Sequence, residues 1–86
     1  MPRLKVVSRK VALDFQFERA ISLGRHISNS LPLPDREISR RHAQVFPREG
    51  GFAVSDLGSR NGVYVNGHRI RDQHVLQPGD EIAMGM

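Results

Sequence analysis

The chain has 86 residues, with 13 Lys and Arg against 9 Asp and Glu, a formal net charge of +4 and no cysteine. This length allows a single domain, over residues 1–86, with one modest core. The lack of cysteine excludes a disulfide framework and a cysteine metal site. No apolar run reaches the roughly 18 residues of a membrane span, and the N-terminus carries no secretory signal. We therefore expect a cytoplasmic protein without a membrane partner.

Short apolar stretches separated by turn residues follow one another along the chain. The large apolar residues from Val11 to Phe17 occupy alternate positions, which is the period of a half-buried strand. In chain order the predicted strands are Leu4–Val7, Val11–Phe17, Ile21–Leu23, Ala43–Phe46, Phe52–Val54, Val63–Val65, His68–Ile70, Val75–Leu76 and Glu81–Met84. Since no segment of about 11 or more residues shows helical spacing, the pattern predicts an all-β sandwich or barrel.

Two longer loops interrupt the predicted strands. Residues 26–37 contain Asn, Ser, Pro and Asp, and residues 56–62 read Asp-Leu-Gly-Ser-Arg-Asn-Gly. These are turn-forming compositions. A third, shorter turn at Asn66-Gly67 is a strong hairpin signal, because both residue types accept positive φ. Since a rigid sandwich presents its binding residues on loops, we expect the functional site on the two longer ones.

The ends of these loops carry guanidinium, hydroxyl and amide groups with few carboxylates nearby. Gly24-Arg25 ends one predicted strand, Ser39-Arg40-Arg41-His42 precedes another, and Ser59-Arg60-Asn61-Gly62 closes the second loop. The planar fork of Arg matches phosphate oxygens, and hydroxyl or amide groups fill the remaining lone pairs. A phosphate monoester carries about −1.5 to −2 charge and three strong acceptor oxygens. The set therefore predicts an anion-binding site rather than a catalytic one.

Five blocks, in this order and at these intervals, resemble the forkhead-associated (FHA) domain. They are Gly24-Arg25, Ile38–Ala43, Asp56–Gly62, Val65–Gly67 and Gly79–Ile82. The resemblance covers roughly residues 4–86. It implies an FHA-like β-sandwich of two antiparallel sheets with binding loops at one end. It also implies a non-catalytic module that recruits phosphorylated partner proteins by recognising phosphothreonine in an extended segment.

Carried over by position, the resemblance implies a role for each site residue. Arg25 and Ser39 bind the phosphate, and Arg40 adds a further phosphate or backbone contact. Asn61 holds the peptide main chain, with Arg60 beside it at a variable contact position. The residues expected to be structural are Gly24, His42, Gly62, Asn66 and Gly67.

Three details of this site follow from the resemblance or from the residues themselves. The resemblance implies that the His42 ring is hydrogen-bonded so as to fix the Ser39 loop. The residues alone leave Arg40 and Arg41 almost equally placed, because alternate residues near a strand start face opposite ways. Glu37 and His26 flank the expected groove, where they could bias which peptide residues are accepted.

The C-terminal end departs from the family pattern. The family usually continues with one more apolar strand after the position of Gly85, whereas this chain stops at Met86. Because that strand normally lies near the N-terminal one, we expect the sandwich to lack its last strand and to keep an open sheet edge. Either the chain is an excerpt of a longer protein, or a partner chain fills the gap by strand exchange or edge pairing.

Three rival functions need to be weighed against phosphopeptide binding. Nucleic-acid binding is the main alternative, because a phosphodiester backbone also attracts Arg; the lack of an aromatic stacking platform disfavours it. A hydrolase would combine Ser39 or Ser55 with His42 and Asp56, but the Gly-x-Ser-x-Gly elbow is missing. We expect no metal and no cofactor, because the four histidines match no recognised ligand spacing: His26, His42, His68 and His74.

Overall fold

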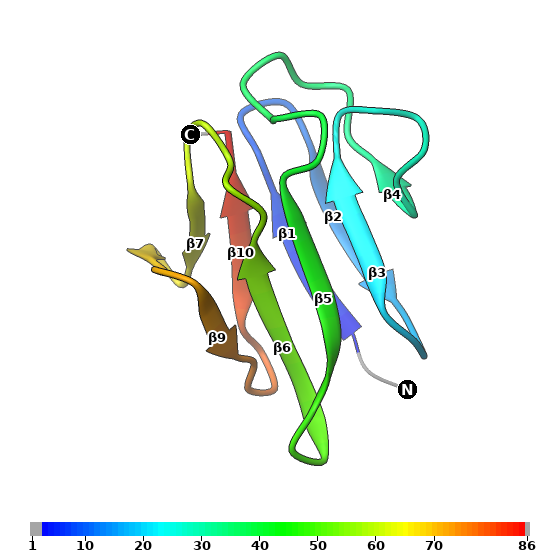
Figure 1. The fold of residues 1–86 in the computed structure, drawn as a ribbon, viewed down its shortest axis with the longest axis vertical. Helices are drawn as coiled ribbons and strands as arrows, with labels where there is room; N and C mark the ends of the chain where they lie inside the picture. The colour runs from blue at the N-terminus through cyan, green and yellow to red at the C-terminus, as the bar shows by residue number, and fades with distance from the viewer. Residues whose placement is uncertain (1–2, 86) are drawn as a thin grey trace.

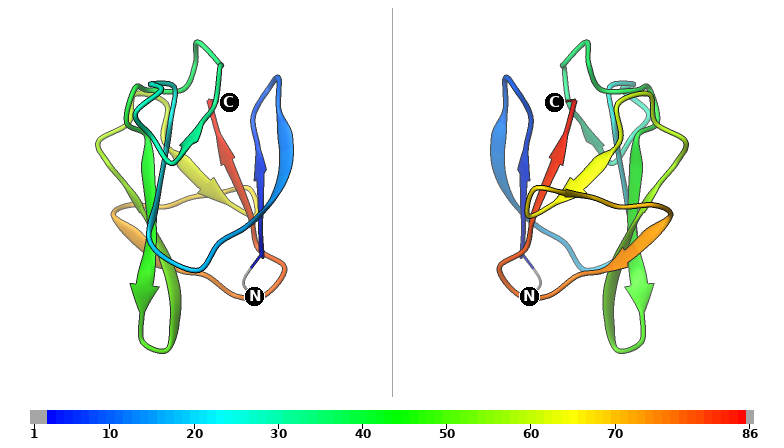
Figure 2. Two further views of the ribbon diagram at one scale, coloured as in Figure 1. Left: turned by 90° about the vertical axis from the view of Figure 1, so that its right-hand side faces the viewer. Right: turned by 90° about the vertical axis from the view of Figure 1, so that its left-hand side faces the viewer.

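The structure, a computed structural model, describes residues 3–85. Two β-sheets of five strands each pack face to face, and this part of the chain contains no helix (Figures 1 and 2). The strands are β1 (Arg3–Val7), β2 (Ala12–Gln16), β3 (Ile21–Gly24), β4 (Leu31–Pro32), β5 (Ala43–Arg48), β6 (Gly51–Asp56), β7 (Val63–Val65), β8 (His68–Arg69), β9 (Gln73–Val75) and β10 (Glu81–Met84). The predicted all-β sandwich is therefore confirmed.

The two sheets are mixed rather than purely antiparallel. One has the strand order β2-β1-β10-β7-β8 and the other β4-β3-β5-β6-β9. Most neighbouring strands are antiparallel, but β1 pairs with β10 and β3 pairs with β4 in parallel. The prediction of two antiparallel sheets thus missed one parallel pair in each, because pairing direction depends on which distant strands become neighbours.

The open edge expected beside the N-terminal strand is not found in the described residues. Strand β10 lies between β1 and β7, with Lys5 opposite Glu81 and Val7 opposite Ala83 in the parallel pair. On its other side β10 forms an antiparallel ladder with β7. Direct pairing of β1 with β10 therefore closes the gap, and β2 and β8 form the edges of this sheet.

Two further strand predictions need correction. The predicted loop 26–37 contains the short strand β4, which pairs in parallel with β3. Next to this pair, the Leu33 N–H donates to the Gly24 carbonyl at 2.8 Å. The predicted strand Val75–Leu76 lies two residues earlier, at Gln73–Val75, where it pairs with β6. Both are short edge strands, whose sequence pattern carries little signal.

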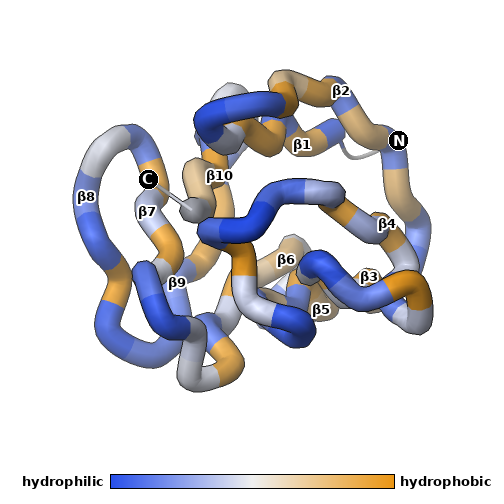
Figure 3. The backbone as a smooth tube through the Cα atoms, turned by 90° about the horizontal axis from the view of Figure 1, so that it is seen from above, coloured by the Kyte–Doolittle hydropathy of each residue, from blue (hydrophilic) through white to orange (hydrophobic). Residues whose placement is uncertain are grey.

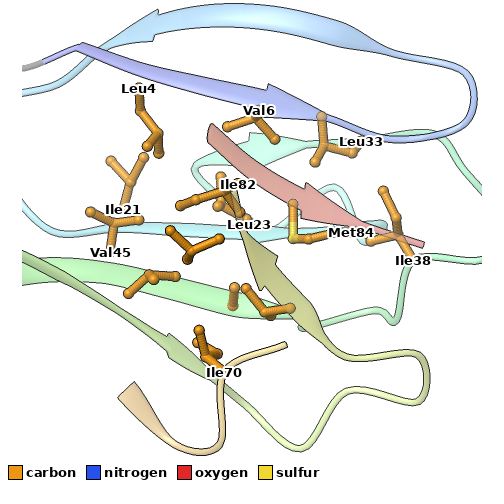
Figure 4. Close-up of a cluster of buried hydrophobic side chains, with 14 of the residues drawn as sticks. Leu4, Val6, Ile21, Leu23, Leu33, Ile38, Val45, Ile70, Ile82 and Met84 are labelled. Carbon is orange, nitrogen blue, oxygen red and sulfur yellow. The ribbon is translucent and has the colours of Figure 1, made fainter. Parts of the chain in front are cut away.

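Buried side chains from both sheets form one core between the layers (Figure 4). Strand β1 contributes Leu4 and Val6, and β10 contributes Ile82 and Met84, each pair at alternate positions as the period of a strand requires. Leu33 and Ile38 belong to the same core, although they lie in the loop before β5. Fully burying one such side chain stabilises the fold by about 1.5–3 kcal/mol. These two residues therefore anchor the loop that leads to Ser39.

Candidate functional site

Three loops meet at one end of the sandwich (Figure 1). They follow β3, precede β5 and join β6 to β7, and Figure 3, which looks onto this end, shows strongly hydrophilic stretches in the loops that cross it. The Arg25 N–H donates to the Ser39 carbonyl at 3.0 Å, and the His26 N–H donates to the Arg40 carbonyl at 3.2 Å. The segments around Arg25 and Ser39, far apart in the sequence, therefore lie side by side.

The Ser39 hydroxyl links the loop before β5 to the loop between β6 and β7. Its Oγ accepts a hydrogen bond from the Arg60 backbone N–H at 3.0 Å. A serine hydroxyl has two lone pairs and one proton. With one lone pair engaged by Arg60, the Ser39 O–H can still donate to an anion in front of it. Ser39 is half-buried, so its hydroxyl is held by the Arg60 N–H while remaining accessible to a ligand.

A pocket of about 510 Å³ opens over this serine, and we refer to it as the arginine pocket. Its lining residues are Arg25, Arg36, Glu37, Ile38, Ser39, Arg40, Arg41 and Arg60. Arg25 and Ser39 thus share one small volume, as the sequence predicts. Arg40 and Arg41 both line it, so the pocket does not distinguish between these two candidates. Such a set of cationic and hydroxyl donors is suited to binding a phosphate or another oxyanion.

The buried ring of His42 forms hydrogen bonds that fix the Ser39 loop. The side chain is fully buried; its Nδ1 accepts the Ser39 backbone N–H at 3.0 Å, and its Nε2 lies 2.7 Å from the Gly62 carbonyl oxygen. This pairing requires the neutral tautomer with the proton on Nε2. Burial lowers the pKa of His42, against the opposing effects of the Gly62 hydrogen bond and the Asp56 charge. The ring therefore stays neutral and connects the loop before β5 to the loop between β6 and β7.

The same contacts exclude His42 as a base for Ser39. Its Nδ1 faces the Ser39 backbone N–H rather than the hydroxyl, and its Nε2 proton is directed at Gly62. A nucleophile–base pair requires the base nitrogen to accept the hydroxyl proton. The hydrolase alternative built on these two residues is therefore wrong. Among residues 3–85 no group of three or more His, Cys, Asp or Glu side chains could hold a metal ion.

Asn61 contacts Glu37 across the rim of the pocket. Its Nδ2 donates to the Glu37 carbonyl oxygen at 2.7 Å and to the Glu37 carboxylate at 3.2 Å. The Asn61 amide group therefore donates to the loop before β5. Its Oδ1 makes no hydrogen bond with the described part of the chain and can accept a backbone N–H from a bound peptide.

Two glycines are required for different reasons, a backbone contact at Gly24 and a left-handed backbone conformation at Gly62. A Cβ at Gly24 would overlap the Arg40 carbonyl oxygen, so only glycine lets β3 approach the Ser39 loop. Gly62 has φ +88°, and a Cβ there would lie 2.6 Å from the Arg69 Nε. Substituting either glycine would move a loop of the arginine pocket.

Asn66 and Gly67 lie at the β7–β8 turn and do not line the arginine pocket. Both have positive φ, 51° and 84°, as the hairpin signal predicts. The Asn66 side chain also donates to the Asp80 carboxylate at 2.8 Å and accepts the Glu81 N–H at 3.0 Å. This turn is therefore tied to the start of β10.

Two buried polar residues that support the pocket were missed by the sequence reasoning. The Asn29 amide donates to the carbonyl oxygens of His26 and Arg40, each at 2.7 Å. The Asp35 carboxylate accepts the Glu37 N–H at 2.9 Å, and this bond is the main cause that lowers the pKa of Asp35. Asn and Asp in a loop signal such turns, but nothing in the sequence distinguishes these two from their exposed neighbours.

The fold and the pocket together define a class of protein: a small all-β sandwich whose loops form a cationic, anion-binding site at one end. A sequence model of the FHA domain matches residues 21–85. Because this match covers more than half of the chain, the chain belongs to the FHA domain family. Within residues 3–85 no helix could cross a membrane.

Known proteins similar to this chain include FHA domains of solved structure. The chain is 50% identical over 62 residues to the oxoglutarate dehydrogenase inhibitor of Corynebacterium efficiens, a match that covers 72% of this chain and 43% of that protein. The FHA domain of CT664 from Chlamydia trachomatis has a similar structure, with a TM-score of 0.81, 30% identity, and coverage of 98% of this chain and 90% of that one. A chain from a study of phosphothreonine-dependent FHA domain interactions gives a TM-score of 0.73, 28% identity, and coverage of 90% and 78%.

Proposed function

We propose that this domain binds phosphothreonine-containing segments of partner proteins, in the cytoplasm and without catalysis. The observation that carries the proposal is the convergence of Arg25, Ser39 and Arg40 on one arginine-lined pocket. Membership of the FHA family supports the proposal, as does the structural similarity to a chain studied for phosphothreonine-dependent interactions. The match spans 43% of the length of the oxoglutarate dehydrogenase inhibitor of Corynebacterium efficiens, so the partner of this chain is proposed only by chemical class.

The roles of the individual residues follow from the donors each presents. The Arg25 guanidinium and the Ser39 hydroxyl bind the phosphate oxygens, and Arg40 contributes a further cationic contact. Arg60 and Asn61 bind the peptide beside the phosphate, with the Asn61 Oδ1 accepting a main-chain N–H. Each charge-assisted hydrogen bond contributes about 1.5–3 kcal/mol. Two or three such bonds produce a large preference for the phosphorylated segment over the bare hydroxyl.

One peptide prepared in three forms tests this function. The forms carry threonine, phosphothreonine or phosphoserine at the same position, and isothermal titration calorimetry measures their affinities at an ionic strength of about 0.15 M. We expect the phosphothreonine form to bind at least about 100-fold more tightly than the threonine form, which corresponds to about 2.7 kcal/mol. The phosphoserine form should bind less tightly than phosphothreonine. Equal affinity for the phosphorylated and bare peptides would exclude the proposal.

Affinity for the phosphopeptide is expected to fall as the pH drops through about 6, where the phosphate monoester gains a proton. The monoanion offers less charge to the arginines, so it binds more weakly. Titrations between about pH 7.5 and 5.5 measure this effect. A difluoromethylphosphonate analogue of phosphothreonine, whose second pKa is lower, should shift the midpoint to lower pH. An unmoved midpoint would assign the response to the protein, and a flat profile would contradict dianion recognition.

A further inference from the structure

We infer that the arginine pocket accepts a segment with two anionic groups: the phosphothreonine and a second phosphate or carboxylate, bound through Arg36 and Arg41. This inference rests on the proposed function of the same site and extends it to the class of ligand. Neither arginine belongs to the set proposed above to bind the first phosphate. The argument depends on the charge of the pocket, on the partners of its arginines and on the position of these two residues.

The pocket holds more positive charge than one phosphate neutralises. Five arginines and one acidic residue, Glu37, are among the residues that line its volume of about 510 Å³. A bound phosphate monoester brings about −1.5 to −2 charge. Roughly half of the net positive charge of the pocket therefore remains when a single phosphate is bound.

The arginines of the pocket have no partner within the described part of the chain. The ion pair that the structure shows among residues 3–85 is Lys5 with Glu81, and neither residue lines the pocket. None of the side-chain hydrogen bonds in this range involves the guanidinium of Arg25, Arg36, Arg40, Arg41 or Arg60; these bonds lie elsewhere or use the Arg60 backbone. Even the Glu37 carboxylate contacts Asn61 rather than an arginine. All five guanidinium groups are thus available to ligand oxygens.

Arg36 and Arg41 extend from anchored backbone on either side of Ser39. Arg36 lies between Asp35 and Ile38, which are both buried, and Arg41 immediately precedes the buried His42. Their side chains are exposed, so the backbone is fixed while the charged groups remain reachable. Both residues line the arginine pocket, so a segment that places its phosphate at Ser39 has a further arginine on each sequence flank of that serine in the same pocket. A second anionic group on the segment would find a charge-assisted partner there.

Defined synthetic peptides test this inference. The series has one fixed phosphothreonine and a second residue, placed in turn at each position within about three residues on either side. That second residue is phosphothreonine, glutamate or glutamine. At the best position we expect the doubly phosphorylated peptide to bind about tenfold more tightly than the glutamine peptide, since the added contact is charge-assisted but solvent-exposed. The glutamate peptide should fall between them if a carboxylate suffices, or match glutamine if only a phosphate does.

The variant Arg36→Gln/Arg41→Gln should reduce this tenfold ratio to about twofold or less. Arg19→Gln is the control for loss of charge elsewhere: it removes one positive charge from the β2–β3 connection, at the opposite end of the sandwich from the pocket, and should leave the ratio unchanged. A ratio near one for the unsubstituted protein would overturn the inference, and so would a ratio that the double variant preserves. In either case tight binding of the singly phosphorylated peptide would leave the proposed function standing. A short oligothymidylate that binds as tightly as the doubly phosphorylated peptide would assign the surplus charge to nucleic acid and would also overturn it.

Discussion

Replacing Arg25 with alanine is expected to weaken phosphothreonine-peptide binding by about 100-fold or more, because two charge-assisted hydrogen bonds of about 1.5–3 kcal/mol each are lost. The side chain is exposed and makes no hydrogen bond within residues 3–85, so its removal leaves no protein group unpaired. The backbone bond from Arg25 to Ser39 does not depend on the side chain. Titration calorimetry measures the affinity, and a thermal melt should show a midpoint close to that of the unsubstituted protein.

Two further variants show whether the guanidinium itself is responsible. Arg25→Lys keeps the charge but loses the planar fork, and should bind with an affinity between those of Arg25→Ala and the unsubstituted protein. Arg19→Ala removes a charge at the other end of the sandwich and should bind normally. Unchanged affinity in Arg25→Ala, with the fold intact, would place the phosphate elsewhere.

Replacing His42 with alanine is expected to lower the free energy of unfolding by about 3 kcal/mol, because it leaves two buried backbone groups without partners. The Ser39 N–H would lose its acceptor and the Gly62 carbonyl its donor, while a cavity would open beneath the pocket. Urea denaturation at neutral pH measures this loss. A change below about 0.5 kcal/mol, the usual range for a surface substitution, would show that the ring does not hold these loops.

Ser39→Ala is the matched control for His42→Ala, because it removes a group at the binding surface rather than beneath it. This variant should bind phosphopeptide more weakly and melt near the unsubstituted protein. His42→Ala should instead lose mainly stability. Acid should add a second distinction. Since burial lowers the pKa of His42 below its ordinary 6.5, the unfolded chain takes up a proton on this ring at a higher pH than the folded one. The stability is then fully present above pH 6.5 and falls as the pH drops toward the folded pKa. His42→Ala should lose this part of the pH dependence.

The sequence reasoning was most successful where a residue acts through its own chemistry or local backbone. The positive φ of Asn66 and Gly67 is a local property, and the hairpin signal found it. The alternation from Val11 to Phe17 located β2, although the strand is shorter than predicted. The five blocks that resemble the FHA domain gave the family and pointed to Arg25, Ser39 and Asn61.

The features that the sequence reasoning missed depend on groups that are distant in the chain. Asn29 supports the site only because the Arg40 carbonyl, eleven positions later, lies within 2.7 Å of its amide. The missed parallel pair of β1 with β10 joins the two ends of the sequence. Neither the partner of a buried amide nor the direction of a non-local strand pair has a sequence pattern of its own.

By itself the sequence determined the all-β class, the turn positions and the supply of arginine, hydroxyl and amide groups on loops, because these depend on residue type and short-range spacing. Only the tertiary structure decided that five arginines face one pocket, that the neutral His42 joins Ser39 to Gly62, and that β10 closes the sheet against β1. The physical reason is that charge density, hydrogen-bond partners and strand neighbours arise from segments brought together by the common core. Spacing along the chain does not encode these distances.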